Sequence, residues 1–213
     1  MPKRTIRSLV SWVNNKQQAE IARISWQDLF QSENISCWIG ESNKVRERFM
    51  FSARNERAEV SVLHLVGDPI VTANGVRLRS ESVLFESLGE RGSDLLRVGK
   101  EVPELFPNLE FCIVQTSPKE RPRRTSRERF DAAHMRTLAA ELFEAGVPAV
   151  VAIPSLSMDI SVSVLRLFAP ALQNWQSSRV LFKAIQQAQL SLLRESLEEQ
   201  AFDLCLYADK EFE

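Results

Sequence analysis

The chain has 213 residues, of which 44% are hydrophobic, so it is long enough for one conventional core and short for two domains. Its 27 basic and 28 acidic residues give a net charge of -1, which provides no global field for nucleic acid or an anionic membrane. The sequence has no apolar run as long as a membrane span, which needs roughly 18 residues. Its basic start, MPKRTIRSLVSWVNN, lacks a secretory cleavage pattern. We expect a single domain over residues 1–213 and a soluble, cytoplasmic protein with no membrane contact.

The sequence lacks the motifs of several common kinds of site. The cysteines Cys37, Cys112 and Cys205 are odd in number and far apart, and each lies in an apolar run, which favours buried thiols over disulfides or a zinc site. The chain lacks the Gly-rich phosphate loops and the GxSxG nucleophile turn. Its two histidines, His64 and His134, have no metal-binding context. We therefore expect no metal and no cofactor.

The first third of the chain predicts a β-α-β unit. Residues 1–15 are either a tether or an extra strand. Apolar residues at helical spacing predict a helix over residues 16–32. A strand follows over residues 35–39, then a helix from an N-cap at Ser42 to Arg54. The next strand, residues 60–66, is β-branched and largely apolar, and it is expected to end at the Gly67-Asp68-Pro69 corner.

The rest of the chain continues the alternation of strands and helices. Residues 76–84 alternate like a hairpin or edge ribbon, and polar helical stretches lead to Pro103 and Pro107. We predict strands over residues 109–115, 147–154 and 202–207, and helices over residues 130–145, 159–173 and 178–197. This order predicts an α/β fold with a mostly parallel sheet covered on both faces. Ligand groups in such sheets lie at the carboxyl ends of strands, here Gly67-Asp68 and Thr116-Ser117.

Five stretches in this order carry a family resemblance. They are CWIGESNKVRERF (37–49), VLHLVGD (62–68), FCIVQTSP (111–118), LAAELFEAGVPAVVAIPSLSMDISVSVLRLFAPAL (138–172) and FDLCLYAD (202–209). Together they resemble the CHAT domain, a caspase-like and separase-like cysteine peptidase fold, from about residue 16 to 212. The resemblance implies a caspase-like three-layer αβα sandwich. It puts the family's catalytic histidine at Asp68 and its catalytic cysteine at Ser117, and it retains an earlier motif histidine as His64.

Both reactive groups of the family are thus replaced. Thiol hydrolysis needs a partly ionised thiol and an imidazole that exchanges protons near neutral pH. A carboxylate is too weak a base to activate a serine, and it repels the developing alkoxide. Cys112 lies inside its strand, five residues before Ser117, and is no substitute. We predict a catalytically inactive pseudopeptidase that serves as a binding, regulatory or scaffold protein for a protease or sensor. A role in bacterial defence or stress signalling rests on family analogy alone.

Other interpretations of these residues stay open. Ser117 with Asp68, or with a residue supplied by a partner, would make an active hydrolase. Asp68 and Ser117 are also ordinary turn residues, with the Asp68 carboxylate binding backbone amides. His64 is typical of a hydrogen-bonded core histidine, and His134 of a residue at the surface or boundary of a helix.

Two segments are candidate partner surfaces. The segment KERPRRTSRER, residues 119–129, is either a solvated loop or an arginine cluster for a carboxylate-rich peptide or a phosphate, with Arg121, Arg123, Arg124 and Arg127 as binding residues. Nucleic acid binding by this segment is a weaker alternative. The predicted last strand, Phe202 to Tyr207, has Phe202, Leu204 and Leu206 on one face, and at a sheet edge it would be a template for pairing. The resemblance implies association of two copies there.

Overall fold

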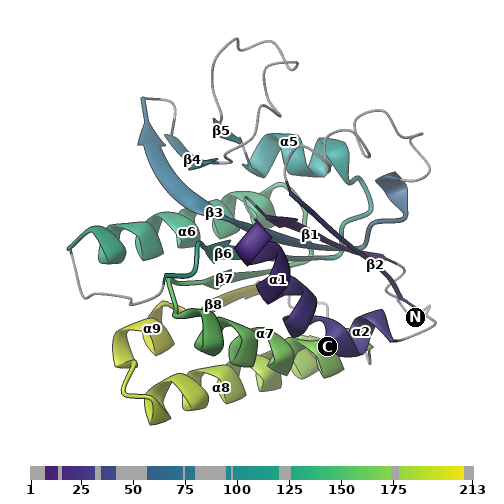
Figure 1. Ribbon diagram of the computed structural model, residues 1–213. Helices are drawn as coiled ribbons and strands as arrows, with labels where there is room; N and C mark the ends of the chain where they lie inside the picture. The colour runs from purple at the N-terminus through teal and green to yellow at the C-terminus, as the bar shows by residue number, and fades with distance from the viewer. Residues whose placement is uncertain are drawn as a thin grey trace.

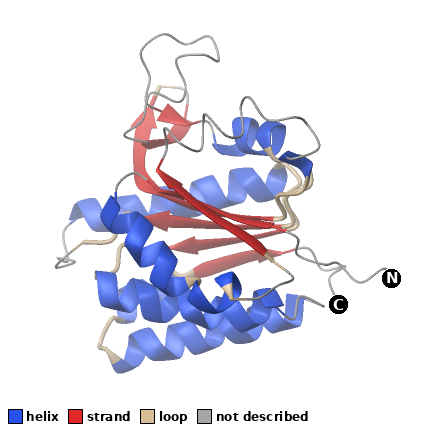
Figure 2. Ribbon diagram, turned by 45° about the vertical axis from the view of Figure 1, so that its right-hand side comes forward, coloured by secondary structure: helices blue, strands red, loops and turns tan. Residues whose placement is uncertain are grey.

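The computed structural model describes residues 8–13, 16–31, 35–41, 57–73, 75–79, 95–96, 98–119, 126–173 and 178–208. These residues form a three-layer α/β sandwich, with a mostly parallel sheet between two layers of helices (Figures 1 and 2). The predicted fold class is confirmed. Within these ranges, no helix combines the length and the apolar character that crossing a bilayer requires.

The sheet runs in the order β2-β1-β3-β6-β7-β8. Its described strands are β1 (Ser8–Val13), β2 (Ser36–Glu41), β3 (Val62–Thr72), β4 (Gly75–Arg79), β5 (Leu95–Leu96), β6 (Phe111–Thr116), β7 (Ala149–Ile153) and β8 (Cys205–Ala208). The pairs along this path are parallel except β7 with β8. An antiparallel ribbon of β4 and β5 extends the second half of β3.

Helices cover both faces of the sheet. Those in the described residues are α1 (Lys16–Ser25), α2 (Gln27–Phe30), α5 (Val98–Leu105), α6 (Ser126–Glu144), α7 (Met158–Gln173), α8 (Ser178–Arg194) and α9 (Glu198–Asp203). We call the face that packs against α1 and α7 the α7 face, and the face under α5 and α6 the α6 face (Figure 2). Side chains of β6 alternate between them: Phe111 and Ile113 enter the core of the α7 face, and Cys112 and Val114 that of the α6 face. Burial on both faces explains why the strand is apolar from Phe111 to Val114.

The N-terminal segment contributes a central strand. β1 pairs with β2 on one side and β3 on the other. Leu9 and Val13 enter the core of the α7 face, whereas Val10 and Trp12 enter that of the α6 face. For residues 8–13 the tether interpretation is therefore wrong and the extra strand is confirmed. β1 also separates the two strands of the predicted β-α-β unit, which are not neighbours in the sheet.

The predicted end of β3 at Gly67 is wrong. Pairing with β6 stops at Gly67 opposite Thr116, but β3 continues because β4 pairs with it from Asp68 to Thr72. Gly75, with φ of 102°, adopts at the hairpin a backbone conformation that favours glycine. The predicted ribbon over residues 76–84 is confirmed as far as Arg79. Its remainder, and the predicted helix from Ser42 to Arg54, lie outside the described residues.

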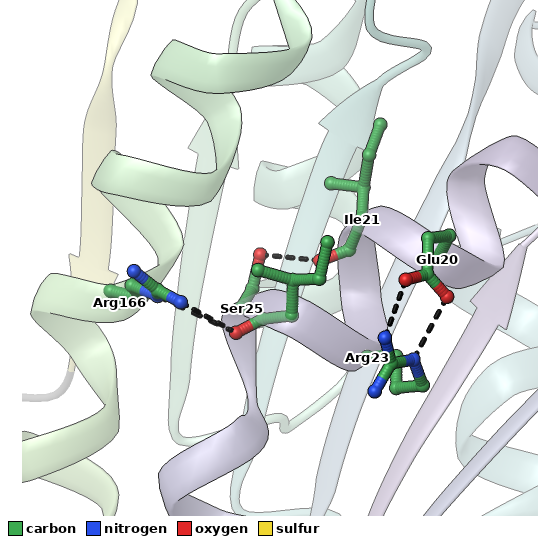
Figure 3. Close-up of polar contacts among 6 residues, drawn as sticks. Glu20, Ile21, Arg23, Ser25 and Arg166 are labelled. Atoms are coloured by element: carbon green, nitrogen blue, oxygen red, sulfur yellow. Dashed lines mark hydrogen bonds and ion pairs between the residues drawn. The ribbon is translucent and has the colours of Figure 1, made fainter.

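The predicted helix over residues 16–32 is two helices, interrupted at Trp26. The Trp26 side chain is fully buried, and its indole N–H donates to His64 Nδ1 at 3.3 Å. Side chains satisfy carbonyl groups in the last turn of α1, where Ser25 Oγ donates to Ile21 O at 2.7 Å (Figure 3). The Arg166 guanidinium of α7 donates twice to Ile24 O, at 3.4 Å each (Figure 3). These contacts fix α1 to the sheet and to α7.

The predicted strand over residues 202–207 begins too early. Phe202 belongs to α9 and is 80% exposed, and β8 starts at Cys205. Leu204 and Leu206 pack in the core of the α7 face, as Phe202 does not. The helix ends here because Leu204 has an extended backbone, which starts the last strand.

Candidate functional site

The two residues singled out by the sequence lie together at the carboxyl edge of the sheet. The backbone N–H of Ser117 donates to Gly67 O at 3.2 Å, which continues the β3–β6 ladder by one hydrogen bond. Asp68 and Ser117 thus follow the paired residues Gly67 and Thr116. Side chains alternate along both strands, and this places the pair on the α7 face, the side of Val66. Both are half-buried.

Asp68 is not the turn residue that one interpretation expected. It lies within β3, opposite Arg79 of β4, at the point where β3 exchanges one partner strand for another. Its Oδ1 atom is buried and has no hydrogen-bond partner in the described part of the chain. A buried carboxylate oxygen without a partner costs free energy, so this atom is a candidate acceptor for a ligand.

Ser117 is anchored by its backbone. Its carbonyl oxygen accepts a hydrogen bond from Ser155 Oγ at 3.5 Å, and the N–H of Lys119 donates to Leu156 O at 3.0 Å. The segments that follow β6 and β7 are therefore joined. Between the described residues, no hydrogen bond links Ser117 Oγ to a side-chain base. The arrangement fixes the position of Ser117 but does not activate its hydroxyl group.

His64 is a core residue of β3, as one interpretation expected. Its side chain is 1% exposed, and its Nδ1 lies 3.2 Å from Ser11 Oγ and 3.3 Å from Trp26 Nε1. The indole N–H can only donate, so the hydrogen-bond network assigns the proton of the neutral imidazole to Nε2, which donates to Gln115 Oε1 at 2.9 Å. Burial lowers the pKa of His64 to about 4, and the Gln115 hydrogen bond opposes this only in part.

The His64 imidazole is therefore not placed for proton exchange. Both ring nitrogens are already bonded inside the core, and the ring is neutral at pH 7. The other imidazole, His134, lies on α6 and is half-buried, with its ring stacked on Phe130 at 6.3 Å between centroids. This agrees with the expected boundary position.

The three thiols lie in β2, β6 and β8, and none forms a disulfide. Cys112 is fully buried on the α6 face, and burial raises its pKa. Burial likewise raises the pKa of Cys37, to about 12. Burial also raises the pKa of Cys205, against a hydrogen bond with Tyr207 and the charge of Arg136. Thiolates are the nucleophilic form, so burial disfavours thiol chemistry at all three positions.

The structure describes little of the predicted arginine cluster. Arg121, Arg123 and Arg124 lie outside the described residues. Arg127 belongs to α6, which begins at Ser126, earlier than predicted. Lys119 is described, half-buried, where the chain leaves the Asp68–Ser117 pair. The cluster therefore begins two residues after Ser117 and runs into α6 at its other end.

The sequence predicted a hydrogen-bonded core histidine at His64 but not its partners Ser11, Trp26 and Gln115. The signals of this network in the sequence are single polar residues inside apolar strands: Ser11 in LVSWV and Gln115 in CIVQT. Both are buried, and both lie on the same face as His64. A second contact that was not predicted joins α6 to α9, where Arg136 Nη1 lies 2.5 Å from Asp203 Oδ1.

Comparisons do not assign the site. Protein-family models, curated proteins and solved structures give no match to this chain. Among the described residues, histidine, cysteine and acidic side chains form no group of three or more that could hold a metal ion.

Proposed function

We propose that the protein is a catalytically inactive, CHAT-like pseudopeptidase that acts by binding a protein partner. The observation that supports this best is the composition of the carboxyl edge. Asp68 lies within β3 next to Ser117, which directly follows the end of β6, while the His64 imidazole has both nitrogens bonded in the core. The three-layer sandwich with a mostly parallel sheet agrees with the fold that the resemblance implies.

The chemistry of the pair argues for binding over hydrolysis. A serine becomes a nucleophile when a base accepts its proton, and an aspartate beside it is a weak base that opposes the negative charge of the alkoxide. A carboxylate oxygen without a partner is instead an acceptor for a donor brought by another molecule. The pair therefore favours recognition.

The partner that we propose is a protease, a sensor or a substrate protein, and the protein would regulate it or act as its scaffold. The arginine-rich segment 119–129 starts two residues after Ser117, so it is a second contact for an acidic part of that partner. A role in bacterial defence or stress signalling remains an inference from the family resemblance. Association of two copies through β8 has the same basis.

Activity-based labelling tests the proposal. A fluorophosphonate probe and iodoacetamide are applied separately to the full chain, to Ser117→Ala and to the control Ser155→Ala, and labelled residues are identified by mass spectrometry. We expect that neither probe labels Ser117 stoichiometrically. The labelling signal of Ser117→Ala should therefore be no lower than that of Ser155→Ala. Stoichiometric labelling of Ser117, or peptide cleavage that Ser117→Ala abolishes, would show an active hydrolase and overturn the proposal.

A further inference from the structure

The second half of β3 has one strand edge with no partner strand among the described residues. Backbone groups of successive residues point to opposite edges of a strand. Gly67 O accepts from Ser117 on the β6 side, so Pro69 and Val71 point to that side too. Ile70 and Thr72 point to the other side, where they pair with β4. β6 ends at Thr116, whereas β3 continues past it (Figure 1).

This edge offers the N–H and carbonyl of Val71 and the exposed Val71 side chain. Pro69 is buried and has no N–H, so its carbonyl oxygen is its only backbone group that faces this side. The Val71 side chain is 61% exposed, although Val76 opposite it on β4 is only 8% exposed. A strand edge with an exposed apolar residue is a template for an extended segment of another chain.

The negative charge of Asp68 makes this edge favour a segment that carries a positively charged side chain. Asp68 directly precedes the free edge, and its buried Oδ1 atom has no partner in the described structure. Asp68 also lies on the opposite face of β3 from Val71, because side chains alternate along a strand. A cationic side chain on one face of an added strand would satisfy the carboxylate, and an apolar side chain on its other face would cover Val71.

We infer that an extended segment of a partner protein adds as a strand to β3 at Pro69–Val71. A lysine or arginine side chain of that segment pairs with the Asp68 carboxylate. The inference rests on the proposed function, because it names the class of partner for the same site. The segment alternates basic and apolar residues. It enters beside Ser117, where β6 has ended.

The test uses the full chain and a defined probe, an acetylated and amidated threonine-arginine-valine-arginine-threonine peptide. The control peptide carries glutamate in place of both arginines. Calorimetry measures affinity, and hydrogen–deuterium exchange resolved by NMR measures protection of the Val71 amide. We expect the arginine peptide to bind at least about tenfold more tightly than the glutamate peptide, since hydrogen bonds to charged groups are the strong ones. Binding should also protect the Val71 amide.

Matched variants test separately how the strand edge at Val71 and the charge of Asp68 contribute to peptide binding. Val71→Pro removes the N–H on the free edge and should abolish binding, whereas Val71→Ala keeps the N–H and should bind. The Val71 N–H points away from β4, so the Ile70 amide should stay protected in both variants and report an intact hairpin. Asp68→Asn should bind both peptides with equal affinity, because it removes the charge and keeps the strand edge.

Three results would overturn the inference: no binding of the arginine peptide, equal binding of both peptides to the wild-type chain, or binding without protection of the Val71 amide. Mass spectrometry of the recovered peptide keeps the two proposals apart. A bound peptide that is cleaved would contradict the pseudopeptidase proposal and leave strand addition standing. An intact peptide that does not bind would overturn strand addition alone.

Discussion

His64 shows how one buried polar residue organises the middle of the sheet. Its ring joins β1 through Ser11, the α1–α2 junction through Trp26, and β6 through Gln115. The Trp26 indole also meets the imidazole edge-on, with centroids 5.6 Å apart. Because every donor and acceptor position on the ring is used, the ring has to stay neutral for the core to close.

This burial predicts a dependence of stability on pH. The pKa of His64 is about 4 in the folded chain and 6.5 in an exposed histidine, so between these values the unfolded chain binds more protons. The contribution of His64 to the free energy of unfolding is complete above pH 6.5. This contribution decreases as pH falls and is lost near pH 4. The free energy of unfolding falls by about 3 kcal/mol over this range because of His64. Below pH 4 the contribution of His64 changes no further.

Urea unfolding of two variants between pH 4 and 8 measures this effect. His64→Gln should lose the part of the pH dependence that falls between pH 4 and 6.5. The control His134→Gln, at a half-buried position on α6, should keep it. An NMR titration of the wild-type imidazole provides a check that needs no variant. Protonation of the His64 ring near pH 6.5 in the folded chain would contradict the prediction.

At the scale of elements, regular patterns predicted the fold and non-local pairing limited the prediction. β6, β7, α7 and most of α6 and α8 lie where apolar runs and helical spacing placed them. Gly67-Asp68-Pro69 looks like the end of a strand, but β4 supplies hydrogen bonds that continue β3. No local pattern contains that information. The carboxyl edge could therefore be predicted from strand order, whereas the free edge of β3 could not.

The packing of α5 on α6 depends on Gly99. A Cβ atom at this position would lie 2.9 Å from Glu141 Cβ and 3.2 Å from the Glu141 carbonyl oxygen. The backbone of α6 cannot yield as a flexible side chain would, so Gly99→Ala forces the two helices apart. We expect it to lower the free energy of unfolding by about 1–3 kcal/mol, although alanine is the better helix former.

Lys100→Ala is the matched control for this prediction. Lys100 is the next residue of α5 and is exposed, so its substitution should change the free energy of unfolding by no more than about 0.5 kcal/mol. Chemical denaturation of both variants checks the pair. A Gly99→Ala variant as stable as Lys100→Ala would show that α5 and α6 adjust without cost.

At the scale of the whole molecule, β1 joins the two cores. It is the second strand of the sheet order and lies between β2 and β3, and its side chains supply both faces. The sequence left residues 1–15 as a tether or an extra strand because a single short strand shows its place only through its partners. Those partners, β2 and β3, begin 28 and 54 residues after β1 begins, at Ser36 and Val62 against Ser8.

A charge inside β1 therefore tests the architecture. Val10 is fully buried on the α6 face, whereas Ser8 is half-buried at the start of the same strand. Val10→Asp buries a carboxylate without a partner and should lower the free energy of unfolding by more than about 4 kcal/mol, while Ser8→Asp should cost less than about 1 kcal/mol. Urea unfolding followed by tryptophan fluorescence and circular dichroism measures both variants. Only a segment that is dispensable to the sheet, as a tether would be, could accept aspartate equally well at both positions.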